Sequence, residues 1–103
     1  MLIDEGRLTA FSSRIFQSLG APQGKADIVA EHLVEANLRG HDSHGVGMIP
    51  SYVYGALRGH LKVNQDTELV QDSGGVMLFD GHLGFGQVVG RQATEQGIER
   101  AKS

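Results

Sequence analysis

The 103-residue chain contains no cysteine and no tryptophan, and it has only two prolines. Without cysteine it has neither disulfides nor thiolate metal ligands, which fits a reducing compartment. No apolar run approaches the roughly 20 residues that a membrane-spanning helix needs. The amino end, residues 1–5, lacks the positive start and the apolar centre of a secretory signal. We therefore expect a cytoplasmic protein without a membrane partner.

An excess of positive charge is also missing. Nine Lys and Arg residues stand against 12 Asp and Glu residues, which gives a formal net charge of −3, and the two signs are mixed along the chain. Binding to a phosphate backbone needs a basic surface, so nucleic acid is not an expected partner. With 40% apolar residues, the chain is long enough for one small domain or for a part of a larger one.

The first 60 residues contain three patterns that are typical of amphipathic helices. The first has apolar residues at spacings of three and four and ends at Gly20, and the second begins at Pro22 and runs toward Arg39. The third covers residues 50–58 and ends before Gly59. The apolar positions of the first two are Leu8, Phe11, Ile15 and Leu19, then Ala26, Val29, Ala30, Leu33 and Val34. We expect these two faces to bury each other, and we expect His32 to be a solvated or packed residue.

The composition changes after residue 60. Residues 67–71 and 76–80 are rich in β-forming side chains and flank a turn at 72–75, which predicts a hairpin or two neighbouring strands. A last helical pattern follows, with a face that includes Val89, Ala93 and Gly97. The predicted fold class is α+β: a three-helix subdomain over residues 1–62, then the start of an α/β unit over residues 63–103.

Residues 39–54 hold the densest group of ionisable side chains, and their glycines and Pro50 interrupt helical structure. His44 follows Ser43 directly and stands two positions after Asp42, so it is the best acid/base candidate in the chain. An ordinary polar turn, in which Asp42 or Ser43 caps a helix, explains the same residues. A metal site at His41 and His44 is not expected, because no third ligand is nearby. We predict an irregular loop between two helices, with the imidazole of His44 facing an open groove.

Several blocks in fixed order resemble the malate/L-lactate dehydrogenase family, whose members are NAD- or NADP-dependent 2-hydroxy-acid oxidoreductases that lack the Rossmann fold. The blocks are LRGHDSHGV at 38–46, IPSYV at 49–53, GHL at 59–61 and DGHLGFGQ at 80–87. The segment GMIPSYV at 47–53 is most similar to the hydroxycarboxylate dehydrogenase B branch of this family. Family members are considerably longer, so the resemblance implies an N-terminal portion that is inactive alone.

The resemblance implies hydride exchange between a nicotinamide, NAD or NADP, and a 2-oxo or 2-hydroxy acid, in a homodimer. His44 matches the family's proton donor and acceptor, and Ser43 matches a residue that relays its proton or orients it. Many members carry arginine four residues after this histidine, where it binds the substrate carboxylate, whereas this chain has Met48. Either another cation, from the missing part of the enzyme or from a partner subunit, binds the carboxylate, or the substrate preference has moved toward apolar side chains.

Two further interpretations concern the rest of the chain. Gly84 and Gly86 precede a helix, where backbone amides can bind phosphate, but the spacing does not complete a dinucleotide fingerprint. We favour a strand-to-helix turn there, and we expect the 103 residues alone to bind no nicotinamide tightly. The alternative function is a non-catalytic helical interaction domain that uses the apolar faces of the first two helices.

Overall fold

The computed structural model describes residues 3–102. Its elements, in chain order, are α1 (Glu5–Ser18), α2 (Gln23–Leu38), the short 3-10 helices η1 (Asp42–His44) and η2 (Val46–Met48), α3 (Ile49–Leu57), β1 (Glu68–Asp72), β2 (Met77–Asp80) and α4 (Gly86–Ala101). Three α-helices, an antiparallel strand pair and a final helix are the predicted α+β order.

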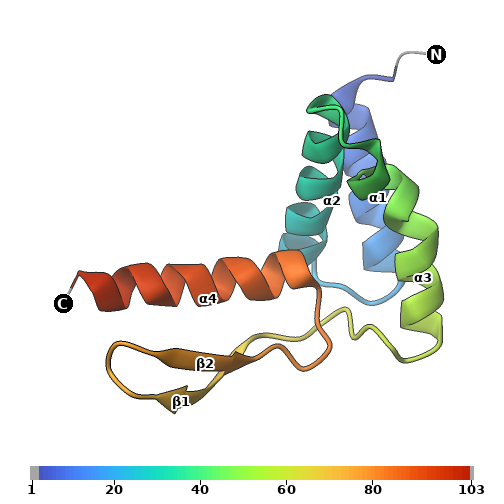
Figure 1. Cartoon of the computed structure of the whole chain (residues 1–103). Coiled ribbons are helices and arrows are strands. Elements are labelled where there is room, and N and C mark those ends of the chain that lie inside the picture. Colours follow the sequence, from blue (N-terminus) through green and yellow to red (C-terminus); the bar gives the residue numbers. More distant parts are fainter. Residues whose placement is uncertain (1–2, 103) are drawn as a thin grey trace.

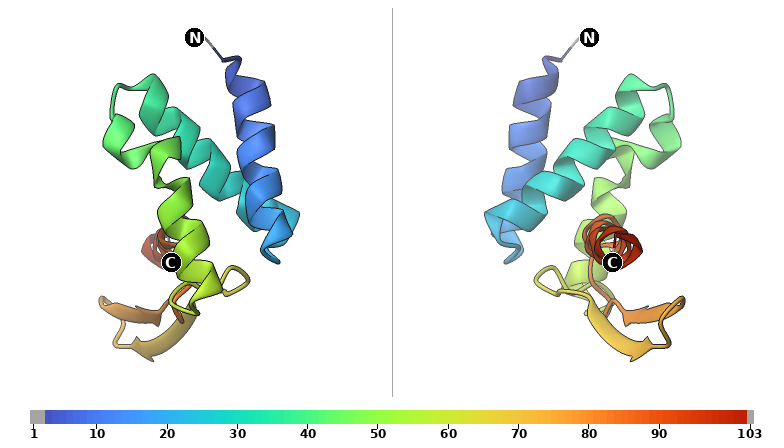
Figure 2. Two further views of the ribbon diagram at one scale, coloured as in Figure 1. Left: turned by 90° about the vertical axis from the view of Figure 1, so that its right-hand side faces the viewer. Right: turned by 90° about the vertical axis from the view of Figure 1, so that its left-hand side faces the viewer.

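The helices α1, α2 and α3 lie together, while α4 leaves this group and extends away from it with the β1–β2 hairpin alongside (Figures 1 and 2). The molecule is accordingly elongated, with extents of 50 × 30 × 22 Å. A polar junction connects the two parts. Lys25 Nζ on α2 lies 3.0 Å from Asp66 Oδ1 before the hairpin, and Gln92 Nε2 on α4 donates to the same oxygen at 2.8 Å.

The hydrophobic core includes the first turn of α4. Phe85 and Val88 are buried in the same cluster as residues of α1 and α2, and the rings of Phe16 and Phe85 meet edge to face with centroids 5.3 Å apart. Each fully buried side chain of this size contributes about 1.5–3 kcal/mol. The start of α4 is therefore fixed against the helical part. The buried members are Phe16, Ala21, Ala26, Val29, Leu33, Phe85 and Val88.

The predicted apolar face of α1 is only partly correct: Leu8, Ile15 and Leu19 are half-buried, and Leu19 packs against the core. Phe11 is 63% exposed, whereas Ser12, Ser13 and Phe16 are buried. Ser13 Oγ donates to Asp27 Oδ1 at 2.6 Å, so a polar pair between α1 and α2 replaces the apolar contact that the periodicity indicated. Small serines permit close approach of the two helices, and periodicity of apolar residues alone does not reveal this. The face of α2 is buried as predicted.

The hairpin agrees with the sequence to within one residue at each strand. Leu69 pairs with Phe79 and Asp72 with Met77, with an irregularity between Leu69 and Gln71 that follows from a bulge. Arg100 near the end of α4 forms two hydrogen bonds with the Asp72 carboxylate and one with the Gly74 carbonyl. This guanidinium, together with the Gly74 amide, lowers the pKa of Asp72 to about 2. The tip of the hairpin is thereby attached to α4.

Candidate functional site

The chain turns sharply after α2, because Gly40 adopts a left-handed φ of 82° that side chains disfavour. The Gly40 amide donates to the Asn37 carbonyl at 3.0 Å, and the His41 amide donates to the Ala36 carbonyl at 2.8 Å. These two bonds are those of a Schellman motif, which ends a helix. Residues 39–48 therefore do not continue α2, as predicted, although the intervening segment is two 3-10 turns rather than a wholly irregular loop.

Ser43 and His44 lie in η1 and contact each other. Ser43 Oγ and His44 Nδ1 are 3.0 Å apart, which is hydrogen-bond distance even though the residues are adjacent in sequence. With Nδ1 engaged, Nε2 is the ring nitrogen that is left for a ligand. The His41 ring lies 5.7 Å from the His44 ring, centroid to centroid. Residues 3–102 contain no group of three or more His, Asp or Glu side chains placed to hold a metal ion.

Asn37, near the end of α2, fixes the turn on both sides of His44. Its Oδ1 accepts the Val46 amide at 2.8 Å, and its Nδ2 donates to Asp42 Oδ1 at 3.0 Å. Gly45, between these two partners, is buried so close to the Asn37 amide that a Cβ on it would overlap three of its atoms. Asp42 is therefore bound to Asn37, and this amide holds the backbone that carries the imidazole.

His44 lines a cavity of about 250 Å³, so its ring faces an opening, as predicted. Five elements converge on this cavity: α2, the two 3-10 turns η1 and η2, α3 and the first turn of α4. One part of its wall is apolar and the other carries imidazole, phenol and amide groups. The lining residues are His32, Leu33, Ala36, His44, Met48, Tyr52 and Gln87.

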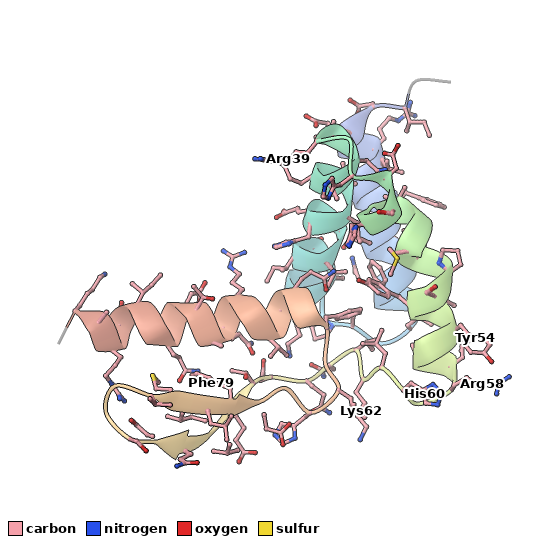
Figure 3. All side chains as sticks on the ribbon, in the orientation of Figure 1. Arg39, Tyr54, Arg58, His60, Lys62 and Phe79 are labelled. Carbon is pink, nitrogen blue, oxygen red and sulfur yellow. The ribbon has the colours of Figure 1, made fainter. Side chains whose placement is uncertain are left out.

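Tyr52 faces this cavity and Tyr54 does not, because residues two apart on a helix point to different faces. Gln87 Nε2 donates to the Tyr52 hydroxyl at 3.0 Å, which connects α4 to α3 at the cavity wall. Tyr54 is exposed on the outer side of α3, where the Arg58 guanidinium lies 4.7 Å from its ring centroid (Figure 3).

The glycine segment before α4 is a tightly packed strand-to-helix turn. A Cβ on Gly81 would lie 3.0 Å from Val89, and one on Gly84 would lie 3.1 Å from Gln65. The left-handed backbone falls instead on His82 and Leu83, with φ of 51° and 64°, which the sequence did not indicate. These glycines therefore serve close packing here, which supports the turn interpretation over a phosphate loop.

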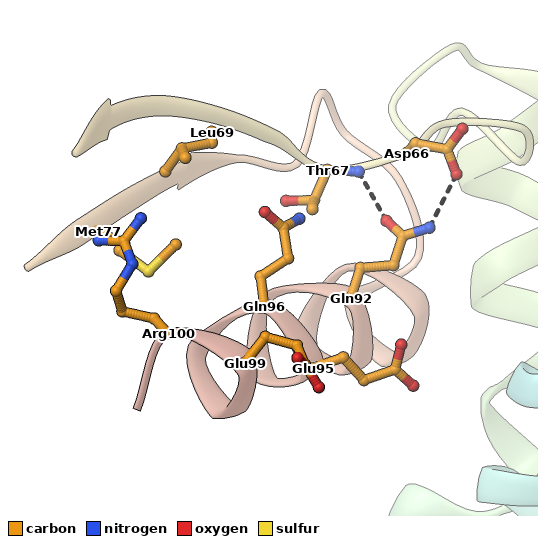
Figure 4. Close-up of a pocket in the computed structure, with 9 residues that line it drawn as sticks. All are labelled: Asp66, Thr67, Leu69, Met77, Gln92, Glu95, Gln96, Glu99 and Arg100. Carbon is orange, nitrogen blue, oxygen red and sulfur yellow. Dashed lines mark hydrogen bonds between the residues drawn. The ribbon is translucent and has the colours of Figure 1, made fainter. Parts of the chain in front are cut away.

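A larger groove of about 670 Å³ lies between the hairpin and α4, away from His44 (Figure 4). Gln92 lines this groove, and its side chain accepts a hydrogen bond from the Thr67 amide at 2.7 Å and donates one to Asp66. The hydrogen bond from Gln92 and the nearby Lys25 lower the pKa of Asp66. The groove is lined by the carboxylates of Asp66, Glu95 and Glu99 against one guanidinium, that of Arg100. This charge disfavours an anionic ligand, so the cavity at His44 is the candidate site.

Comparison with known proteins decides the family. The malate/L-lactate dehydrogenase family model matches residues 3–103, nearly the whole chain. The chain belongs to this family. It is 44% identical to hydroxycarboxylate dehydrogenase B of Escherichia coli over 98 residues, which are 95% of this chain and 27% of that protein.

Solved structures agree. Malate dehydrogenase from Pyrococcus horikoshii matches with a TM-score of 0.93 and 36% identity over 99% of this chain and 29% of its own. Sulfolactate dehydrogenase from Methanocaldococcus jannaschii matches with a TM-score of 0.94 and 33% identity, over 100% of this chain and 30% of its own. The chain thus spans less than a third of the length of these relatives. No helix in residues 3–102 has the length and apolar character to cross a membrane.

The sequence pattern missed three residues of the site. His32 is exposed, as expected of a solvated residue, and it also lines the cavity with His44. Gln87 ends the motif at residues 80–87, but the sequence indicates no role for it, and it indicates none for Asn37. His32 and Ala36 are one helical turn apart, and Asn37 follows in the next position, so a helical projection of α2 toward the turn is the signal that finds them.

Proposed function

We propose that the full-length protein is a nicotinamide-dependent oxidoreductase that interconverts a 2-oxo acid and a 2-hydroxy acid, with His44 as the proton donor and acceptor. The observation that carries this proposal is the contact of His44 Nδ1 with Ser43 Oγ at the edge of a small cavity. Membership of the malate/L-lactate dehydrogenase family supports the reaction class.

The proton chemistry follows from the position of His44. When hydride reaches the carbonyl carbon of a 2-oxo acid, negative charge develops on the oxygen. An imidazolium at that oxygen delivers a proton as the charge forms, and the neutral ring takes a proton in the oxidising direction, an effect typically worth about 10²–10⁴-fold. Ser43 is the proposed orienting partner, because its contact with Nδ1 leaves Nε2 for the substrate.

The cofactor has no complete site in this part of the protein. The cavity of about 250 Å³ is smaller than the space that a dinucleotide fills, and its lining contains no lysine or arginine to meet a pyrophosphate. Gly81 and Gly84 pack closely against Val89 and Gln65, whereas Gly86 has open space around it. We therefore assign no cofactor-binding residue, and NAD and NADP remain alternatives. When bound, the nicotinamide supplies the hydride.

Met48 lines the cavity at the position for which the family resemblance implies arginine in many members, and Leu33 and Ala36 extend the apolar wall. A flexible thioether accepts varied apolar shapes, so we propose a substrate with an apolar or aryl side chain. The relatives named above are a hydroxycarboxylate, a malate and a sulfolactate dehydrogenase, whose names describe small hydroxy acids. A homodimer is proposed on the family resemblance alone, and a cytoplasmic location on the composition of the chain, which contains no cysteine.

The test is oxidation of NADH and of NADPH by the full-length protein with pyruvate, oxaloacetate, 2-oxoglutarate and phenylpyruvate. Turnover with at least one acid, lost in His44→Ala, is the expected result. The competing interaction domain is favoured by exposed apolar side chains, among them Phe11 on α1 and Leu57 on α3. No oxidation of either cofactor with any of the four acids would refute the dehydrogenase and leave that interpretation.

A further inference from the structure

Few side chains that line the cavity at His44 can carry positive charge. Among residues 3–102 its lining contains neither lysine nor arginine, so the imidazoles of His32 and His44 are the only side chains of this part of the protein that can place positive charge there. A 2-oxo acid is an anion whose carboxylate is bonded directly to the carbonyl carbon. The group that binds the carboxylate and the group that protonates the carbonyl must therefore line the same small space. His44 is needed at the carbonyl oxygen, which leaves His32 as the cationic side chain that this part of the enzyme can supply.

We propose that protonated His32, assisted by the side-chain amide of Gln87, binds the substrate carboxylate in the His44 cavity. The inference rests on the proposed function and names the cation that replaces the arginine absent at Met48. Charge-assisted hydrogen bonds to carboxylates are roughly twice as strong as neutral ones, so one imidazolium can serve in this role. Gln87 is held in place by its bond to the Tyr52 hydroxyl, and its amide carries a second N–H that is available as a donor.

The surroundings of His32 are consistent with a binding role. His32 and Gln87 also line a second opening, of about 450 Å³, between α2 and α4. The charged groups that face it there are Arg91 and Glu95, which pair with each other at 3.1 Å. On its own helix Glu35 pairs with Arg39 at 2.6 Å. Because these neighbours are ion-paired, none of them is left to hold the His32 imidazolium, and the titratable side chains that line the cavity with it are those of His44 and Tyr52.

The first arm of the experiment separates binding from chemistry in the full-length enzyme. His32→Gln keeps hydrogen-bonding capacity but cannot carry charge. We expect it to raise KM for phenylpyruvate about tenfold or more with kcat within about threefold, the pattern of a lost ground-state contact. His60→Ala, an exposed histidine outside the cavity lining, is the matched control and should change neither constant.

The second arm uses pH. Because a neutral imidazole cannot form an ion pair with a carboxylate, KM of the parent enzyme should rise as pH increases. His32→Arg keeps its charge throughout, and we expect it to flatten the rise in KM while the decline of kcat in the reductive direction, assigned to His44, persists. A structural role of His32 does not predict this separation.

Equilibrium binding of phenylpyruvate, measured by calorimetry on the same proteins, distinguishes the two levels of inference. If the parent binds the acid but oxidises no NADH or NADPH, the proposed function fails, and the affinity of His32→Gln still decides the role of His32. Unchanged affinity and unchanged KM in His32→Gln would overturn the carboxylate site. A KM of His32→Arg that rises with pH like that of the parent would overturn it as well.

Discussion

Replacement of Gly45 by alanine tests how the turn that carries His44 is held. The φ of Gly45 is −95°, outside the left-handed region, so its backbone alone does not demand glycine. The demand comes from Asn37, whose Oδ1, Cγ and Nδ2 atoms would all be overlapped by the new Cβ. The amide has to move, and its bonds with the Val46 amide and the Asp42 carboxylate are then lost.

The magnitude follows from these contacts. An extra methyl group forced into a packed site costs about 1–3 kcal/mol, and a lost hydrogen bond costs about 0.5–1.5 kcal/mol. The Asn37–Asp42 bond is exposed and contributes little, whereas the bond to Val46 is partly buried. We expect Gly45→Ala to lower the free energy of unfolding by about 2–3 kcal/mol, and Asn37→Ala by about 1–1.5 kcal/mol.

The double variant is the decisive measurement. With alanine at position 37, the atoms that the Cβ of Gly45→Ala would overlap are gone, and the hydrogen bonds are already absent. Its cost should equal that of Asn37→Ala within about 0.5 kcal/mol rather than the sum of the two, because residues in contact are not additive. Urea unfolding followed by circular dichroism gives the three values. Strictly additive costs would show that Asn37 does not determine glycine at position 45.

The other predictions concern chemistry and charge. His44→Ala should lower kcat about 10²–10⁴-fold with unchanged cofactor affinity, and His41→Ala much less, in steady-state kinetics. Met48→Arg should shift kcat/KM from phenylpyruvate toward oxaloacetate, whose second carboxylate a guanidinium favours. Because Arg100 lowers the pKa of Asp72 from 3.8 to about 2, their contact should stabilise fully above pH 3.8 and be lost as pH falls toward 2. Carbon-13 NMR titration of the Asp72 carboxyl checks this value.

The sequence predicts the helices well where the signals are local. Gly20, Gly40 and Gly59 each follow the end of a helix and have positive φ, so the boundaries of α1, α2 and α3 could be read from glycine positions. The hairpin follows from alternation and from the turn at residues 72–75. The division of the chain between residues 62 and 63 stays a prediction.

The errors arise where the outcome depends on partners distant in the chain. The buried face of α1 includes serines, because Asp27 on α2 accepts a hydrogen bond from the hydroxyl of Ser13. The periodicity of apolar residues does not reveal this pairing. Left-handed His82 and Leu83 were unexpected, because glycines flank both residues and the packing contacts of those glycines decide which positions turn. His32 was undervalued because only the fold brings it to the cavity of His44.

Packing in the core determines the positions of the side chains in the site. Gln87 reaches the cavity from α4, and it does so because Phe85 and Val88, on either side of it, are buried against α1 and α2. Tyr52 connects the core to the cavity wall. Its ring packs near Phe16 and Phe85, and its hydroxyl accepts a hydrogen bond from the Gln87 amide. A loosened core at Phe16 should therefore move the amide of Gln87 away from His32 without touching either residue. The positions of the polar groups in the cavity wall therefore depend on the aromatic packing behind them.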